Sequence, residues 1–203
     1  EICACLVGSE MCIRDRDFLG KRGFVVPDDY LVAITSKNFD AAAEYTKERF
    51  NLPESEEEII KEWFDMAIEA YTNEVKLKAG VIDYLKQLKA EGIKIAAATS
   101  SDERLFRPCL THCGIMKYFD AFTVTQEVKR GKGFPDVYQL AAEKLSLKPE
   151  QCVVYEDILK GVEGAKMDDF YVVGVEDIHS SYEKNEIMQL SDCYILSFEE
   201  LLD

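Results

Sequence analysis

The stretch "VVYEDILKGVEGAK", residues 153–166, joins a strand pattern to a helix pattern across two adjacent acids. Its first residues form a short, apolar, β-branched run, which is typical of a buried strand. Residues 158–166 predict a helix, and three small residues on it allow close packing: Gly161, Gly164 and Ala165. Glu156 and Asp157 therefore stand where a strand ends and a helix begins.

The same alternation continues outward through most of the chain after residue 77. Short apolar runs predict further strands at "IKIAAA", "AFTVT", "YVVGV" and, at an edge, "CYIL". Helical segments and short connections separate these runs, as in βαβ units with right-handed crossovers. We therefore expect an α/β fold with a Rossmann-like, three-layer core and a mostly parallel sheet over residues 77–203.

The segment before residue 77 follows a different pattern. Ser55 and Glu58 have the spacing of a capping box, and apolar residues then recur at helical spacing. Nothing in this segment predicts a strand. We expect residues 17–76 to form an α-helical cap appended to the α/β core.

Active sites of open parallel sheets lie at the carboxyl ends of their strands, so the residues that follow each strand are candidates. Thr99 and Ser100 follow the first of these strands, and Ser100 with Glu103 has the spelling of a capping box. A helix start with hydroxyls and free N–H groups can bind an anion. An ordinary helix cap explains the same letters equally well.

Two further strand ends carry charge. Lys132 follows the second strand in "KRGKGFPD", where it could contact phosphate oxygens or simply lie in a solvated loop. Glu156 and Asp157 suit a hard cation such as Mg²⁺, which prefers oxygen ligands. Carboxylates at a helix start are also common partners of the helix dipole.

Composition limits the possible partners. The 203-residue chain has a net charge of −15, which argues against nucleic-acid binding, since phosphate backbones require clustered Lys and Arg. No apolar run approaches the length of a membrane span, and no signal peptide is predicted. An odd count of seven cysteines is typical of reduced thiols and favours a cytoplasmic location. The oligomeric state stays open, with a monomer plausible.

The combination of these strand ends resembles the haloacid dehalogenase-like superfamily. "IAAATSS", "GKGFPDVY" and "VVYEDILKGVEGAK" are similar to its second, third and fourth motifs, in that order. The resemblance covers about residue 17 to the end and is greatest to the helical-capped subgroup with β-phosphoglucomutase and phosphoglycolate phosphatase. Gly133 departs from the pattern, because the family often has proline there.

The resemblance implies a Mg²⁺-dependent phosphatase of small phosphomonoesters that forms an aspartyl-phosphate intermediate. Glu156 and Asp157 would hold Mg²⁺, while Thr99, the Ser100 N–H and Lys132 would hold the phosphoryl oxygens. Two alternatives remain: a β-phosphoglucomutase-type isomerase with the same site, and a non-catalytic phosphate-binding protein of the same fold. The expected partner in each case is a small phosphorylated metabolite.

The family's nucleophile is an aspartate in an Asp-x-Asp that follows an apolar central strand. Asp15 and Asp17 have this spacing, but neither an apolar strand before them nor Gly-Thr after them. "CLVGSEMCIRDR", residues 5–16, instead resembles a peptide from translated adaptor-derived sequencing reads. We therefore expect residues 1–16 to be non-native, the cap to be truncated, and this chain to be inactive as it stands.

This interpretation has a structural consequence. A sheet without its central strand leaves two neighbouring strands with unpaired edges, which is a severe defect. The only apolar candidate to fill the gap is residues 2–7. We expect this segment either to enter the empty slot or to leave it open, and Gly8, Ser9 and Glu10 could not replace an aspartyl nucleophile.

Overall fold

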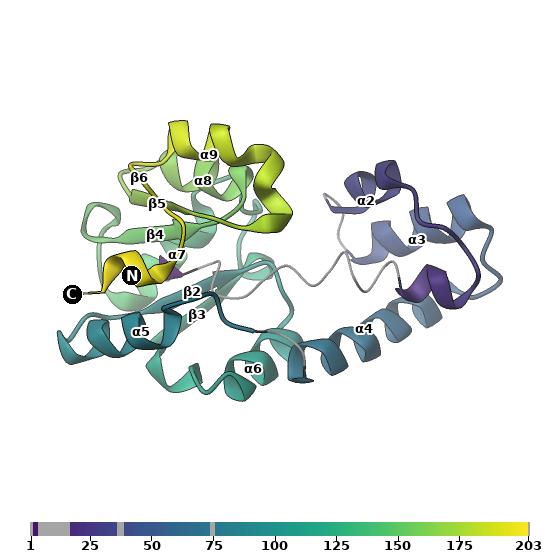
Figure 1. Cartoon of the computed structure of the whole chain (residues 1–203), viewed down its shortest axis with the longest axis horizontal. Helices are drawn as coiled ribbons and strands as arrows, with labels where there is room; N and C mark the ends of the chain where they lie inside the picture. The colour runs from purple at the N-terminus through teal and green to yellow at the C-terminus, as the bar shows by residue number, and fades with distance from the viewer. Residues whose placement is uncertain (1, 4–16, 36–38, 74–75, 203) are drawn as a thin grey trace. The chain divides into compact units, whose positions relative to one another are not determined.

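The computed structural model describes residues 2–3, 17–35, 39–73 and 76–202 (Figure 1). The chain divides into two compact units. We call residues 1–8 with 76–203 the sheet unit and residues 9–75 the helical unit. No helix within the described ranges is both long and apolar enough to cross a bilayer.

The sheet unit contains six parallel strands in the order β3-β2-β1-β4-β5-β6. The strands are β1 Ile2–Cys3, β2 Ala96–Thr99, β3 Ala121–Val124, β4 Val153–Glu156, β5 Tyr171–Val175 and β6 Cys193–Ile195. The chain moves outward from β1 in both directions, so the sheet is doubly wound. The predicted α/β fold with a mostly parallel sheet is confirmed.

Strand β1 occupies the central position. Ile2 pairs with Ala96 of β2 on one side and with Val154 of β4 on the other. The prediction that the N-terminal apolar segment enters the slot is therefore confirmed for Ile2 and Cys3. The rest of that segment, together with Gly8, Ser9 and Glu10, lies outside the described residues.

Helices cover both faces of the sheet (Figure 1). They are α5 Val81–Ala90, α6 Glu103–His112, α7 Asp136–Leu145, α8 Leu159–Lys166 and α9 Lys184–Leu190. Short 3₁₀ helices are η1 Met116–Tyr118, η2 Thr125–Glu127, η3 Pro149–Gln151, η4 Ile178–Glu183 and η5 Phe198–Leu201. Successive residues of a strand face opposite sides, so Tyr155 packs with α5 and α6, and Val154 packs with α7, α8 and α9. This is a three-layer core.

The helical unit contains α2 Asp28–Thr35, α3 Phe39–Phe50 and α4 Glu56–Asn73, preceded by a helical segment at residues 17–21. Its core gathers around Phe18 and Trp63, whose rings meet edge to face. The predicted capping box is confirmed: the Ser55 N–H donates to Glu58 Oε2 at 2.8 Å, and the Glu58 N–H donates to Ser55 Oγ at 3.2 Å.

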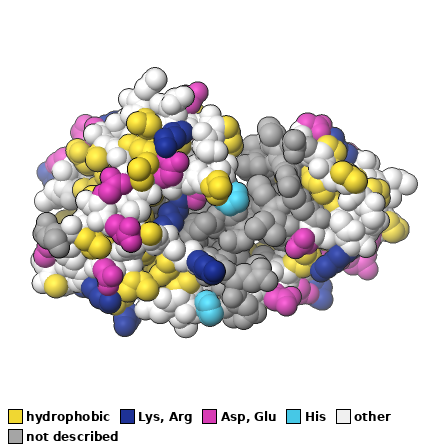
Figure 2. Space-filling view, viewed as in Figure 1, with side chains coloured by type: hydrophobic (Ala, Val, Ile, Leu, Met, Phe, Trp, Pro, Cys, Tyr) yellow, Lys and Arg dark blue, Asp and Glu magenta, His cyan; other side chains and the backbone are white. Residues whose placement is uncertain are grey.

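The face of the sheet unit seen in Figure 2 mixes hydrophobic and charged side chains. Asp and Glu side chains are interspersed there with Lys and Arg, in keeping with a chain that has 39 acidic and 24 basic residues. The coloured residues of this face show no large patch of a single sign.

Candidate active site

The carboxyl ends of the parallel strands bring several predicted residues to one edge of the sheet. Thr99 is the last residue of β2 and Glu156 the last residue of β4, and β1 lies between these two strands. Glu176 and Asp177 directly follow β5, which neighbours β4. Since all strands point the same way, these ends meet at the edge where open α/β sheets bind ligands.

Glu156 is the buried centre of this edge. Its side chain has no exposed surface, and its Oε1 accepts hydrogen bonds from Lys132 Nζ at 2.8 Å and from Tyr138 Oη at 2.6 Å. Its other oxygen, Oε2, is buried and has no hydrogen-bond partner among the described residues. A buried charged oxygen without a partner is costly, so Oε2 is suited to a ligand.

Two glycines of α8 make room for this arrangement. A Cβ atom at Gly161 would lie 2.4 Å from the carboxyl carbon of Glu156. One at Gly164 would lie 2.0 Å from the carbonyl oxygen of Lys132. The close packing predicted for these two positions is therefore confirmed, and it fixes both Glu156 and the loop that carries Lys132.

Asp157 follows Glu156 and is largely enclosed. Burial raises the pKa of its carboxyl to about 6, although the nearby Lys78 ammonium acts to lower this pKa. Lys78 Nζ lies 3.1 Å from Asp157 Oδ2. Proximity to the Glu156 carboxylate adds to the upward shift, because two like charges disfavour ionisation.

Thr99 and Ser100 lie where the sequence predicts, but the helix cap there is different. The N-cap of α6 is Asp102, whose Oδ1 accepts from the Arg104 N–H at 2.9 Å. The expected capping box of Ser100 with Glu103 is wrong. Asp102 directly precedes the helix, and Glu103 Oε1 accepts from Arg107 Nη2 at 2.7 Å. Thr99 Oγ1 accepts locally from the Ser101 N–H at 3.0 Å.

Comparison with known proteins now identifies the family. A family model described as haloacid dehalogenase-like hydrolase matches residues 16–167. The chain belongs to this family. The resemblance carried by the strand-end motifs is therefore confirmed, and the protein is a hydrolase by family.

Several relatives of this haloacid dehalogenase-like hydrolase have curated names. A phosphorylated carbohydrates phosphatase of Thermotoga maritima is 34% identical over 64% of this chain and 59% of its own length. Hexitol phosphatase A of Escherichia coli is 30% identical over 89% of this chain and 81% of its own length. Several relatives are matched over only 42–59% of their length, so the chain spans about half of them.

A solved structure extends the likeness over the whole chain. It is that of a Thermotoga maritima protein provisionally described as a β-phosphoglucomutase, with 26% identity and a TM-score of 0.80. The alignment covers 99% of this chain and 95% of that one. The α/β core with a helical cap region is thus common to both.

Members of this family use Mg²⁺, and the described residues fit such an ion. No group of three or more His, Cys, Asp or Glu among them is arranged to hold a metal. Mg²⁺ in phosphoryl-transfer sites needs fewer protein ligands, because it keeps waters and binds one or two carboxylates with the substrate phosphate. The unpartnered Glu156 Oε2 and the adjacent Asp157 carboxylate meet that need.

The family's aspartate pair should follow the central strand. Asp15 lies outside the described residues. Asp17 is exposed and begins the helical segment 17–21 of the helical unit, so it does not follow a described strand. The residues that directly continue β1 also lie outside the described part of the chain.

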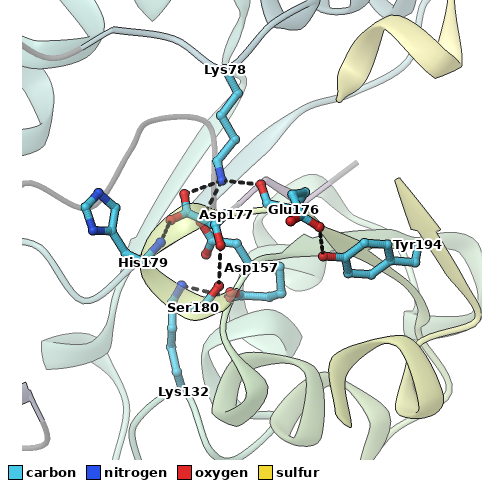
Figure 3. Close-up of polar contacts among 9 residues, drawn as sticks. Lys78, Lys132, Asp157, Glu176, Asp177, His179, Ser180 and Tyr194 are labelled. Atoms are coloured by element: carbon cyan, nitrogen blue, oxygen red, sulfur yellow. Dashed lines mark hydrogen bonds and ion pairs between the residues drawn. The ribbon is translucent and has the colours of Figure 1, made fainter. Parts of the chain in front are cut away.

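Sequence reasoning missed two members of the site, Lys78 and Asp177. Lys78 Nζ bridges Asp157 and the loop after β5, as Figure 3 shows. A signal for Asp177 exists in the sequence: "VEDIH" at the end of β5 repeats the Glu-Asp-Ile of "YEDIL" at the end of β4. Lys78 has no comparable signal, because it directly follows none of the six described strands and lies in a stretch with no acidic or hydroxyl partner beside it, between Leu77 and Ala79.

Proposed function

We propose that this protein is a Mg²⁺-dependent phosphatase of small phosphomonoesters, of the phosphorylated sugar and polyol class. The observation that carries the proposal is the buried cluster of Lys132, Glu156 and Asp157 beside the central strand, with one carboxylate oxygen unpartnered among the described residues. The curated names of the relatives support the substrate class, since they include phosphatases of phosphorylated carbohydrates and of hexitols.

The chain's own residues divide the work in this proposal. Lys132 is held by Glu156 at 2.8 Å, which keeps its ammonium at the strand edge to contact a phosphoryl oxygen. Thr99 Oγ1 and the Ser100 N–H, at the end of β2, hold other phosphoryl oxygens. Glu156 and Asp157 would hold Mg²⁺, which neutralises phosphate charge when bound.

Fixed charges of this kind act where negative charge develops during phosphoryl transfer. They need little reorganisation because packing and hydrogen bonds already hold them, which is the basis of electrostatic stabilisation of a transition state. Tyr138 contributes by fixing Glu156 Oε1, and the absence of a side chain at Gly161 leaves room for that carboxylate.

The covalent step needs an aspartate that attacks phosphorus and a second aspartate that acts as general acid and base. We propose that Asp15 and Asp17 do not fill these roles, and that this chain turns over slowly or not at all. We further propose that residues 17–76 act as the cap that excludes water and selects the substrate, with residues 77–203 as the catalytic core.

Phosphate release from a generic aryl phosphate in the presence of Mg²⁺ tests the proposal. We would compare the present chain with one whose residues after β1 carry a family-type Asp-x-Asp-Gly. Activity only in the restored chain, lost again with Lys132→Met, is the expected result. A restored chain that folds but releases no phosphate would exclude the phosphatase function, and activity in the present chain would exclude our interpretation of its N-terminus.

A β-phosphoglucomutase-type isomerase is the second candidate, favoured by the solved structure with a TM-score of 0.80. It would use the same residues but return the phosphoryl group to the sugar. Incubating the restored chain with a sugar phosphate and measuring free phosphate against the isomerised sugar phosphate separates the two activities. Tight phosphate binding without either activity would instead indicate a non-catalytic phosphate-binding protein.

A further inference from the structure

The site contains a lysine for which the proposed phosphatase chemistry has no use. Lys78 precedes α5, and its side chain is only 13% exposed. Figure 3 shows it reaching the strand edge between Asp157, after β4, and Asp177, after β5. A buried ammonium is costly unless it is paired, so its position is determined by the carboxylates around it.

The acceptors around Lys78 Nζ are well defined. It lies 3.1 Å from Asp157 Oδ2, 2.5 Å from Asp177 Oδ2 and 3.0 Å from the Glu176 carbonyl oxygen. An ammonium has three protons to donate, and these acceptors come from the ends of two neighbouring strands. Lys78 therefore links the candidate metal ligand Asp157 to the loop after β5.

The loop after β5 is held in place by contacts of its own. Asp177 Oδ1 accepts from the His179 N–H at 2.8 Å, and Glu176 Oε2 lies 2.6 Å from Lys184 Nζ. Tyr194 Oη also donates to Glu176 Oε2. These contacts keep Asp177 in position, so the bond to Lys78 is a fixed feature rather than a loose surface pair.

The position of Lys78 conflicts with a cation on the same carboxylate. A divalent ion bound to Asp157 would be within a few ångströms of the ammonium, and like charges at such distances repel strongly inside a protein. Asp157 then has two competing partners: the lysine of its own chain and the metal ion. Lys78 can retain Asp177 when it gives up Asp157.

We propose that Lys78 is a positioning residue that competes with the divalent cation for Asp157 and so lowers the affinity of the metal site. In the metal-free protein it neutralises Asp157, and on metal binding it releases Asp157 and keeps its contacts with Asp177 and the Glu176 carbonyl. The inference rests on the proposed function, because it requires Glu156 and Asp157 to be the metal ligands.

Binding of Mn²⁺ to this chain, followed by electron paramagnetic resonance at fixed ionic strength, tests the inference. Mn²⁺ prefers the same oxygen ligands as Mg²⁺ and reports binding without any turnover. Lys78→Met removes the charge and keeps much of the side-chain volume, whereas Lys78→Arg keeps the charge. Lys166→Met is the matched control, since Lys166 pairs with Asp192 at 2.8 Å within the same unit.

We expect Lys78→Met to tighten Mn²⁺ binding by about tenfold or more, because a repelling unit charge is removed. Lys78→Arg and Lys166→Met should bind as the unmodified chain does, and Asp157→Asn should abolish binding. Unchanged or weaker binding by Lys78→Met overturns the inference while the metal site stands. No binding by any of these chains, in folded protein, overturns the metal site and the inference together.

Thermal unfolding provides a second measurement if Lys78→Met is unstable. The variant leaves two carboxylates without their shared cation, so it should melt lower than the unmodified chain in the absence of metal. Added Mn²⁺ should raise its melting temperature by more than that of the unmodified chain, because at equal concentration a ligand that binds the folded state more tightly stabilises it more. An equal or smaller rise in the variant contradicts the competition.

Discussion

Gly164→Ala perturbs the site through packing alone. The new Cβ would lie 2.0 Å from the Lys132 carbonyl oxygen and 2.8 Å from the Phe134 nitrogen, both backbone atoms. Ordinary contact begins near 3.4 Å, so the carbonyl must retreat by 3.4 − 2.0, or about 1.4 Å. Overpacking costs ~1–3 kcal/mol, and a backbone clash this close belongs to the upper part of that range, ~2–3 kcal/mol, of which the higher helix propensity of alanine offsets ~1 kcal/mol.

We therefore expect Gly164→Ala to lose about 1–2 kcal/mol of unfolding free energy. Urea denaturation followed by far-UV circular dichroism measures this loss, as a midpoint lowered by roughly 0.5–1 M. Tryptophan fluorescence alone is unsuitable, because the single tryptophan, Trp63, lies in the core of the helical unit. Gly20→Ala is the control, since Gly20 is exposed on a helix with open space around it and should gain stability.

The same substitution should affect Lys132, because the displaced carbonyl belongs to that residue. Misplacing a catalytic group by about 1 Å can cost on the order of 10²-fold in rate. In a chain with a restored first motif, Gly164→Ala should therefore lower phosphate release more than its stability loss explains. A variant that unfolds at or above the urea midpoint of the unmodified chain would refute the packing argument.

Three further predictions concern single side chains. Because burial raises the pKa of Asp157 to about 6, the folded state retains a proton that the unfolded chain, with a pKa of 3.8, has lost. Above pH 6 the ionised Asp157 carboxylate therefore lowers the unfolding free energy by up to ~3 kcal/mol. The unfolding free energy recovers this amount as the pH falls from 6 towards 4. Asp157→Asn should flatten the pH dependence of the unfolding free energy in that window, and an unchanged slope would contradict the assignment. Tyr138→Phe removes a donor to Glu156 Oε1 at 2.6 Å and should cost about 1–3 kcal/mol in urea denaturation, more than Tyr171→Phe at an exposed position. Ser55→Ala removes the α4 capping box and should cost ~0.5–2 kcal/mol, seen as an earlier fluorescence transition of Trp63; an unshifted transition would show that the cap is not stabilising.

Much of the fold follows from local patterns. Apolar β-branched runs alternate with helical segments after residue 77, and such runs are stable only when both faces are covered, which predicts a parallel sheet with helices on each side. The helix spanning Leu159–Lys166 and the strand spanning Val153–Glu156 differ little from their predicted limits. The capping box at Ser55 was equally visible, because its two hydrogen bonds join residues three apart.

The convergence of Lys132 with Glu156 was also predictable from order along the chain. Lys132 follows β3 and Glu156 ends β4, and parallel strands end at one edge, so topology brings their side chains together. The cap of α6 could not be decided in this way. Ser100 and Asp102 both suit an N-cap, and the choice between them depends on where the backbone enters the helix.

Lys78 and Asp177 show what the sequence by itself could not determine. They are 99 positions apart, and they meet because β5 lies beside β4 and because the chain before α5 passes the same strand ends. The sequence determined which residue types follow each strand, since local periodicity records strands, helices and their ends. Only the tertiary structure decided which charges share one enclosed space, because pairing there depends on strand order and burial, which no local pattern records.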